Sequence, residues 1–133
     1  MEGSAEVLLV VGTLVLTYGF LLGIPFARAR MKGPSAPRSL VNNHLEAMMG
    51  GSALIALSLA AGYSTLDKGF EQVAAWLLSI GVVAAVGGGT LNWLMKTEDA
   101  FAEKPVGFYL QSASGPAISA GGVLMSIGVL MGL

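Results

Sequence analysis

Four long apolar segments, separated by short charged joints, constrain the fold of this chain more than any other feature. They cover about 7–26, 44–63, 73–95 and 110–133, and Pro25 with the basic residues after it ends the first. Each segment has roughly the twenty residues that a helix needs to cross a bilayer. None shows the alternation of apolar and polar residues that marks a strand of a membrane barrel. The sequence therefore predicts an all-α integral membrane protein in which a single domain, 1–133, forms a bundle of four transmembrane helices.

The composition excludes several other classes of protein. Hydrophobic residues make up 54% of the 133 residues and charged residues 11%. A soluble domain of this size has too little interior to bury so much apolar surface. The net charge of −1 provides no basic surface for nucleic acid. Without cysteine the chain has no disulfide, thiolate nucleophile or iron–sulfur ligand, and its single histidine excludes a histidine-rich metal site within one subunit.

The positive charges predict how the chain is oriented. Six of the seven lysines and arginines lie in the first and third joints: Arg28, Arg30, Lys32, Arg38, Lys96 and Lys104. Only Lys68 lies in the second joint. Because cytoplasmic loops carry the excess of basic residues, we expect a multi-pass protein of the cytoplasmic (inner) membrane with both termini outside the cytoplasm.

Rows of small residues mark places where helices can approach one another closely in lipid. The rows are Gly81, Ala85 and Gly89 in the third segment, Ser52, Ala56 and Ala60 in the second, and Ala113, Ala117 and Gly121 in the fourth. Four helices alone enclose little interior, so these rows favour a homo-oligomer in the membrane. The alternative is that they pack helices inside one subunit, and both interpretations can hold together.

The stretch 38–51 holds the residues with the clearest chemical potential. His44 is the only histidine, and a histidine at the edge of a membrane span is costly unless it has partners or a function. Neutral imidazole is a good ligand for transition metals and haem iron. Met48 and Gly51 follow at helical spacing on the same face, where small and apolar surroundings suit a flat macrocycle. The alternative is an interfacial histidine bonded to a lipid headgroup, a water or a loop carbonyl.

The other polar residues near His44 have both functional and structural interpretations. Glu46 lies about 200° around the helix from His44, so we do not expect the two to share a metal. It is either a surface carboxylate near a helix N-terminus or the intramembrane carboxylate of a proton-coupled transporter. Asn42 and Asn43 are suited to cap the second helix. Met48 and its neighbour Met49 are typical packing residues.

The order of these features along the chain resembles a known family. A basic loop with proline and glycine leads to the lone histidine, and a Gly/Met-rich turn, a short Asp-Lys joint and a Leu-Leu-Ser-Ile helix follow. From Arg38 to Asn92 this pattern resembles the styrene oxide isomerase family of small membrane proteins. The resemblance implies a four-helix subunit, a homotrimer and haem b bound through His44, with ferric iron acting as a Lewis acid on an epoxide to give an aldehyde. The family's asparagine six residues after the histidine is Gly50 here, and its pocket tyrosine falls near Asn92.

The leading functional prediction is a haem b-dependent membrane isomerase for a small apolar epoxide. In this prediction His44 binds the iron, Met48 and Gly51 line the cofactor site, and Asn92 and Asn43 are the candidate catalytic residues. Asn92 equally suits a hydrogen bond between helices. Two other functions remain open. One is a non-catalytic haem-binding or electron-transfer protein with one of the seven methionines as second axial ligand. The other is a small proton-coupled transporter.

Overall fold

The computed structural model describes residues 3–133, of which 87% are helical, and contains no strand in that range. Four long helices make up most of it: α1 (Gly3–Lys32), α2 (Arg38–Ala60), α3 (Lys68–Leu94) and α5 (Val106–Gly132). A short 3-10 helix, η1 (Ala61–Tyr63), extends α2, and one helical turn, α4 (Ala100–Glu103), lies between α3 and α5. All four long helices are long and apolar enough to cross a membrane. The predicted all-α fold with four such helices is confirmed.

Helix α2 begins at Arg38, well before the apolar segment itself. Pro37 precedes its first residue, and the fixed φ angle and missing N–H of proline suit a helix start. Asn42 and Asn43 therefore lie inside the helix and do not cap it. Their side chains are available for other contacts, and Asn43 is fully buried.

Helix α1 continues through Pro25 as far as Lys32. A proline removes one backbone donor, but helices of membrane proteins tolerate this loss where neighbouring groups satisfy the freed carbonyl. The apolar part of α1 still ends near Pro25, because Arg28, Arg30 and Lys32 follow. The helix is thus longer than the segment that can lie in the membrane.

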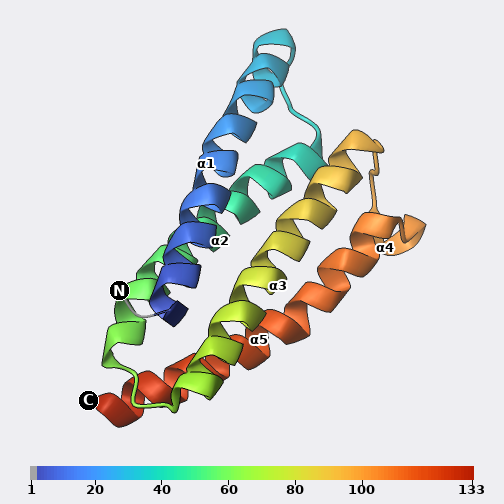
Figure 1. Ribbon diagram of the computed structural model, residues 1–133. Coiled ribbons are helices and arrows are strands. Elements are labelled where there is room, and N and C mark those ends of the chain that lie inside the picture. Colours follow the sequence, from blue (N-terminus) through green and yellow to red (C-terminus); the bar gives the residue numbers. More distant parts are fainter. Residues whose placement is uncertain (1–2) are drawn as a thin grey trace.

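Helix α3 is the centre of the arrangement. It packs along α5 and also contacts α1 and α2, whereas α1 and α2 pack along each other (Figure 1). Over its most apolar stretch 56% of the residues of α3 are buried, against 17% for α5. Helices α2 and α5 do not pack along their lengths. The molecule is therefore two helix pairs joined through α3, with a gap in packing between α2 and α5.

Small residues bring the paired helices into backbone contact. A Cβ added to Gly51 of α2 would lie 2.9 Å from the carbonyl oxygen of Gly12 on α1. A Cβ added to Gly81 of α3 would lie 3.1 Å from the backbone nitrogen of Ile118 on α5. The row of small residues in the third segment thus packs inside the subunit. On α2, in contrast, Ser52 and Ala56 are exposed.

The two ends of the bundle differ in charge. At one end the α2–α3 connection packs on the end of α5, where the backbone N–H of Thr65 donates to the carbonyl oxygen of Gly128 (3.1 Å). The start of α1 lies at the same end, because Ser4 Oγ donates to the Glu71 carboxylate. Lys68 belongs to this end. The other six basic residues lie at the opposite end, in the last turns of α1, at the first residue of α2 and in the α3–α5 connection (Figure 1).

Candidate functional site

His44 is held in one orientation by helix α1. Its Nδ1 donates to the carbonyl oxygen of Gly19 at 2.8 Å. Its ring stacks on Phe26, with 5.6 Å between the ring centroids and 25° between the planes. A carbonyl oxygen can only accept, so Nδ1 carries a proton, and in the neutral imidazole Nε2 then keeps its lone pair. The side chain is half-buried, and its observed partner is the carbonyl of a helix and not that of a loop.

Met48 and Gly51 share the face of α2 that carries His44, as the helical spacing predicts. A Cβ added to Gly51 would lie 2.5 Å from the backbone nitrogen of Leu16. One added to Gly19 would lie 3.0 Å from the sulfur of Met48. Helix α1 therefore fills the space beside both residues. Within this subunit their direct role is to bring α1 against α2.

Glu46 lies on the other flank of α2, toward α3 and α5. Gln111 of α5 donates from Nε2 to Glu46 Oε2 at 3.2 Å and reaches the carbonyl oxygen of Ala85 at 3.3 Å. Helix α2 begins at Arg38, so Glu46 is not at the helix N-terminus. A charged side chain costs about 2.5–3.5 kcal/mol at the centre of a membrane helix, and the Gln111 amide offsets part of such a cost. His44 and Glu46 are thus separated, as their positions around the helix predict.

Asn43 joins three helices through a chain of hydrogen bonds. Tyr18 of α1 contacts Thr90 Oγ1 of α3 at 2.6 Å. With the Asn43 amide oriented to satisfy both of its polar atoms, Oδ1 accepts from Thr90 Oγ1 (2.8 Å) and Nδ2 donates to the carbonyl oxygen of Val86 (2.9 Å). Gly89 makes room for this side chain, since a Cβ there would lie 2.7 Å from an atom of the Asn43 side-chain amide. The buried amide therefore fixes α2 against α3.

Asn92 belongs to the Glu46 flank. Its Nδ2 donates to Gln111 Oε1 at 3.1 Å, which is a hydrogen bond between α3 and α5. Its side chain is 5% exposed, and Oδ1 has no hydrogen-bond partner among the described residues. The residue packs against Gly107, where no side chain would fit. The two candidate catalytic asparagines thus both face the interior around α3, and Asn92 is grouped with Gln111 and Glu46.

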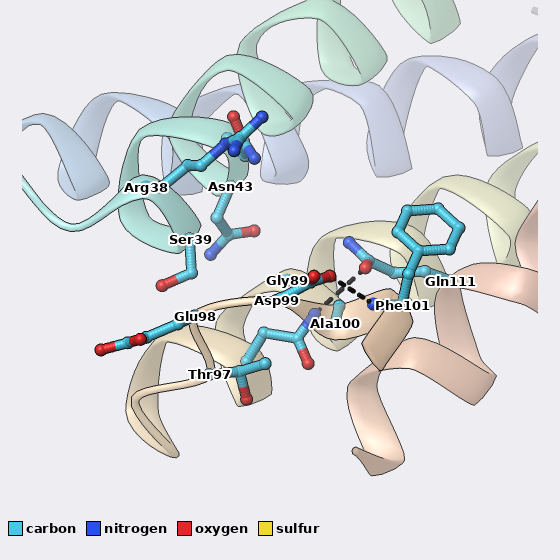
Figure 2. Close-up of a pocket in the computed structure, with 12 residues that line it drawn as sticks. Arg38, Ser39, Asn43, Gly89, Thr97, Glu98, Asp99, Ala100, Phe101 and Gln111 are labelled. Atoms are coloured by element: carbon cyan, nitrogen blue, oxygen red, sulfur yellow. Dashed lines mark hydrogen bonds between the residues drawn. The ribbon is translucent and has the colours of Figure 1, made fainter. Parts of the chain in front are cut away.

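A polar cleft lies next to Asn92 and Gln111, at the end of the bundle that carries six of the basic residues. It has a volume of about 320 Å³. Figure 2 shows Arg38, Ser39 and Asn43 of α2 on one side and residues of the α3–α5 connection and α5 on the other, among them Asp99 and Gln111. The cleft adjoins a more apolar groove of about 470 Å³ between α2 and α5, and Asn42 and Gln111 line both.

Three residues of these networks were not singled out by the sequence: Gln111, Thr90 and Tyr18. Each is a polar side chain in or beside an apolar segment, and that position is the only signal the sequence offers. The partners come from different helices, 65 residues apart for Gln111 and Glu46 and 72 for Tyr18 and Thr90. Pairings of this kind depend on helix packing, which the periodicity of one segment does not specify.

Comparison with protein-family models, curated proteins and solved structures finds no match to this chain. What the site can do follows from its own side chains. One flank of α2 presents an imidazole with a free nitrogen, held by a carbonyl of α1. The other presents a carboxylate and two amides next to a groove.

Proposed function

We propose that this protein is a haem b-dependent membrane isomerase that converts a small apolar epoxide into a carbonyl compound. The observation that carries the proposal is the hydrogen bond from His44 Nδ1 to the carbonyl oxygen of Gly19. It selects the imidazole tautomer in which Nε2 is free to bind iron. Histidines that bind metals usually donate their other N–H to a carbonyl or carboxylate oxygen in this way.

The residues around His44 fit a haem held at the edge of the α1–α2 pair. The imidazole is half-buried and its ring is restrained by Phe26. The space between the two helices is closed, because Gly51 brings the backbone of α2 against that of α1. His44 would therefore hold the iron outside this contact. Gly51 and Met48 would act by keeping α1, and with it the carbonyl of Gly19, in place.

A ferric haem at this position would supply a Lewis acid that polarises the epoxide C–O bond, so that ring opening and a 1,2-shift give the carbonyl compound. The chain's own part is to orient the iron through one imidazole and to exclude water, which would otherwise open the epoxide to a diol. Exposed apolar side chains on the same two helices, such as Phe20, Ile24 and Leu45, provide a water-poor setting. The candidate catalytic residue Asn92 lies on the other flank of α2, with its unpartnered Oδ1 buried against Gly107, so within one subunit it would not contact an epoxide at an iron bound to His44.

A homo-oligomer, and a trimer by the family resemblance, is part of the proposal. A half-buried His44 at the edge of a helix pair needs lipid or a second copy of the chain to complete its surroundings. The exposed small residues Ser52 and Ala56 on α2 allow another helix to approach closely. Native mass spectrometry of the detergent-purified protein should find three chains per particle, and a monomer that retains haem and activity would contradict this part.

The proposal places the protein in the cytoplasmic membrane, with the end that carries six basic residues inside. Ser35 in the first joint and the exposed Gly62 lie at opposite ends of the bundle, and the chain has no cysteine of its own. On intact cells an impermeant thiol reagent should label Gly62→Cys but not Ser35→Cys. Labelling of both variants from the same side would overturn the topology.

The activity is tested with the ferric protein, without oxygen or an electron donor, because an isomerisation is redox-neutral. We expect styrene oxide to be converted to its aldehyde, with the product identified by chromatography, and His44→Ala to be inactive. Reduction to the ferrous state should lower the rate, because a lower charge polarises the epoxide oxygen less. Haem-loaded protein that forms no aldehyde from this or related epoxides would favour a non-catalytic haem-binding protein.

A further inference from the structure

The groove between α2 and α5 is a second place where a small molecule can bind. Its apolar lining consists of Leu45, Met49, Gly50, Val82, Ala85 and Ile118. Its volume of about 470 Å³ lies in the range of small-molecule sites. Leu45 and Met49 on its rim are 51% and 72% exposed. The groove therefore opens on the outer surface of the bundle, where a molecule dissolved in the membrane can enter from the side.

One carboxylate with unused capacity for hydrogen bonds lines this groove. Within residues 3–133 the Glu46 carboxylate accepts one hydrogen bond, from Gln111 Nε2. An ionised carboxylate has sites for about four hydrogen bonds, and leaving them unused away from water is costly. A molecule that satisfies Glu46 must therefore bring N–H or O–H donors.

The charges around the groove and the adjoining cleft favour a cation. Three carboxylates line the two cavities, Glu46 in the groove and Glu98 and Asp99 in the cleft. Arg38 is the one basic residue among those lining them. Next to an apolar groove, an ionised donor paired with a carboxylate forms a stronger hydrogen bond than a neutral one.

We propose that the α2–α5 groove binds a small amphipathic amine from the membrane. The apolar body lies between Met49 and Ile118, and the ammonium group donates to the Glu46 carboxylate. This site is on the opposite flank of α2 from His44 and does not depend on the proposed haem. It adds a ligand class, an amine, that the isomerase proposal does not include.

The probe is radiolabelled n-octylamine, measured by equilibrium dialysis against the protein in phosphatidylcholine nanodiscs, with empty nanodiscs subtracted. 1-Octanol and octanoate have the same apolar length with a neutral and an anionic head. We expect one saturable amine site per chain, roughly tenfold weaker binding of octanol and no saturable binding of octanoate. Equal affinity for octylamine and octanol in the unaltered protein would overturn the proposal.

Three variants locate the site. Glu46→Gln should lose the preference for octylamine over octanol. Its binding of octanol should be retained, and this retention is the control that the groove is still formed. Met49→Trp should abolish binding of both probes by filling the groove. Leu59→Trp is its matched control, because Leu59 is also an exposed apolar residue of α2, at 68%, and does not line the groove. Persistence of the amine preference in Glu46→Gln, or binding in Met49→Trp, would contradict the assignment.

Two further comparisons separate this inference from its alternatives. Octylamine binding should be unchanged in His44→Ala, so a failure of the haem proposal leaves it intact, whereas loss of binding in that variant would contradict two independent sites. Phosphatidylethanolamine also carries an ammonium group. If adding it to the nanodiscs displaces octylamine, the occupant is a lipid headgroup and the proposal of a small amine is wrong.

Discussion

The two flanks of helix α2 differ in how closely the neighbouring helix packs against them. Toward α1, Gly51 lies on the backbone of the neighbouring helix, and His44 donates to a carbonyl of that helix. Toward α5 there is no such backbone contact, and Glu46 reaches the neighbouring helix only through the long side chain of Gln111. One flank therefore fixes a side chain in place, and the other leaves room for a ligand.

Two adjacent glycines show the origin of this difference. A Cβ on Gly51 would meet backbone atoms of Leu16, the nearest at 2.5 Å. A Cβ on Gly50 would meet only the side chain of Val82, at 2.8 Å. The Val82 side chain can shift further than the backbone of a helix can. The requirement for glycine is thus stricter on the His44 flank than on the groove flank.

The largest effect is expected from Gly51→Leu. The added side chain must push α1 away, which should lower the free energy of unfolding by about 3 kcal/mol and separate Gly19 from His44. We expect a several-fold lower ratio of haem to protein, measured from the absorption spectrum, together with a lower melting temperature in detergent. Gly62→Leu is the matched control, since a Cβ there meets no atom within 4 Å. Equal losses in both variants would show that the close contact at Gly51 is not what holds the site.

A smaller effect is expected from Asn43→Leu. The substitution removes the hydrogen bonds of Asn43 to Thr90 and to the Val86 carbonyl, at a cost of about 2 kcal/mol. The exposed neighbour Asn42 provides the control, and Asn42→Leu should change stability little. If Asn43 is a structural bridge, the folded fraction of Asn43→Leu keeps its haem and its rate per haem. A normal melting temperature combined with lost turnover would instead make Asn43 a catalytic residue.

The smallest effect is expected from Met48→Leu. Met48 packs on Gly19, and replacing it with a residue of similar volume should cost about 1 kcal/mol or less. The haem spectrum should be unchanged, since the proposed iron site uses no methionine. A shift of the reduced absorption bands in this variant would support the electron-transfer alternative, in which a methionine is the second axial ligand.

The sequence predicts the parts of this molecule that depend on hydropathy and helical spacing. These are the four apolar helices, the common face of His44, Met48 and Gly51, and the separation of Glu46 from His44. Asn42 and Asn43 were expected as caps because their amides suit that role, but Pro37 already provides the start of α2. The link from Glu46 through Gln111 to Asn92 was not predicted, because it depends on which helices pack together. The sequence also does not predict that α1 packs over the face of α2 that carries His44, for the same reason.

The absorption spectrum of the detergent-purified protein, prepared with haem supplied during expression, tests the central claim most directly. We expect a Soret band in the unaltered protein and in Glu46→Gln, which alters only the groove flank. His44→Ala should lose the band while its helical circular dichroism is unchanged, because insertion depends on hydropathy and not on one residue. A normal Soret band in His44→Ala, or no band in the unaltered protein, would contradict the assignment of His44 as the iron ligand.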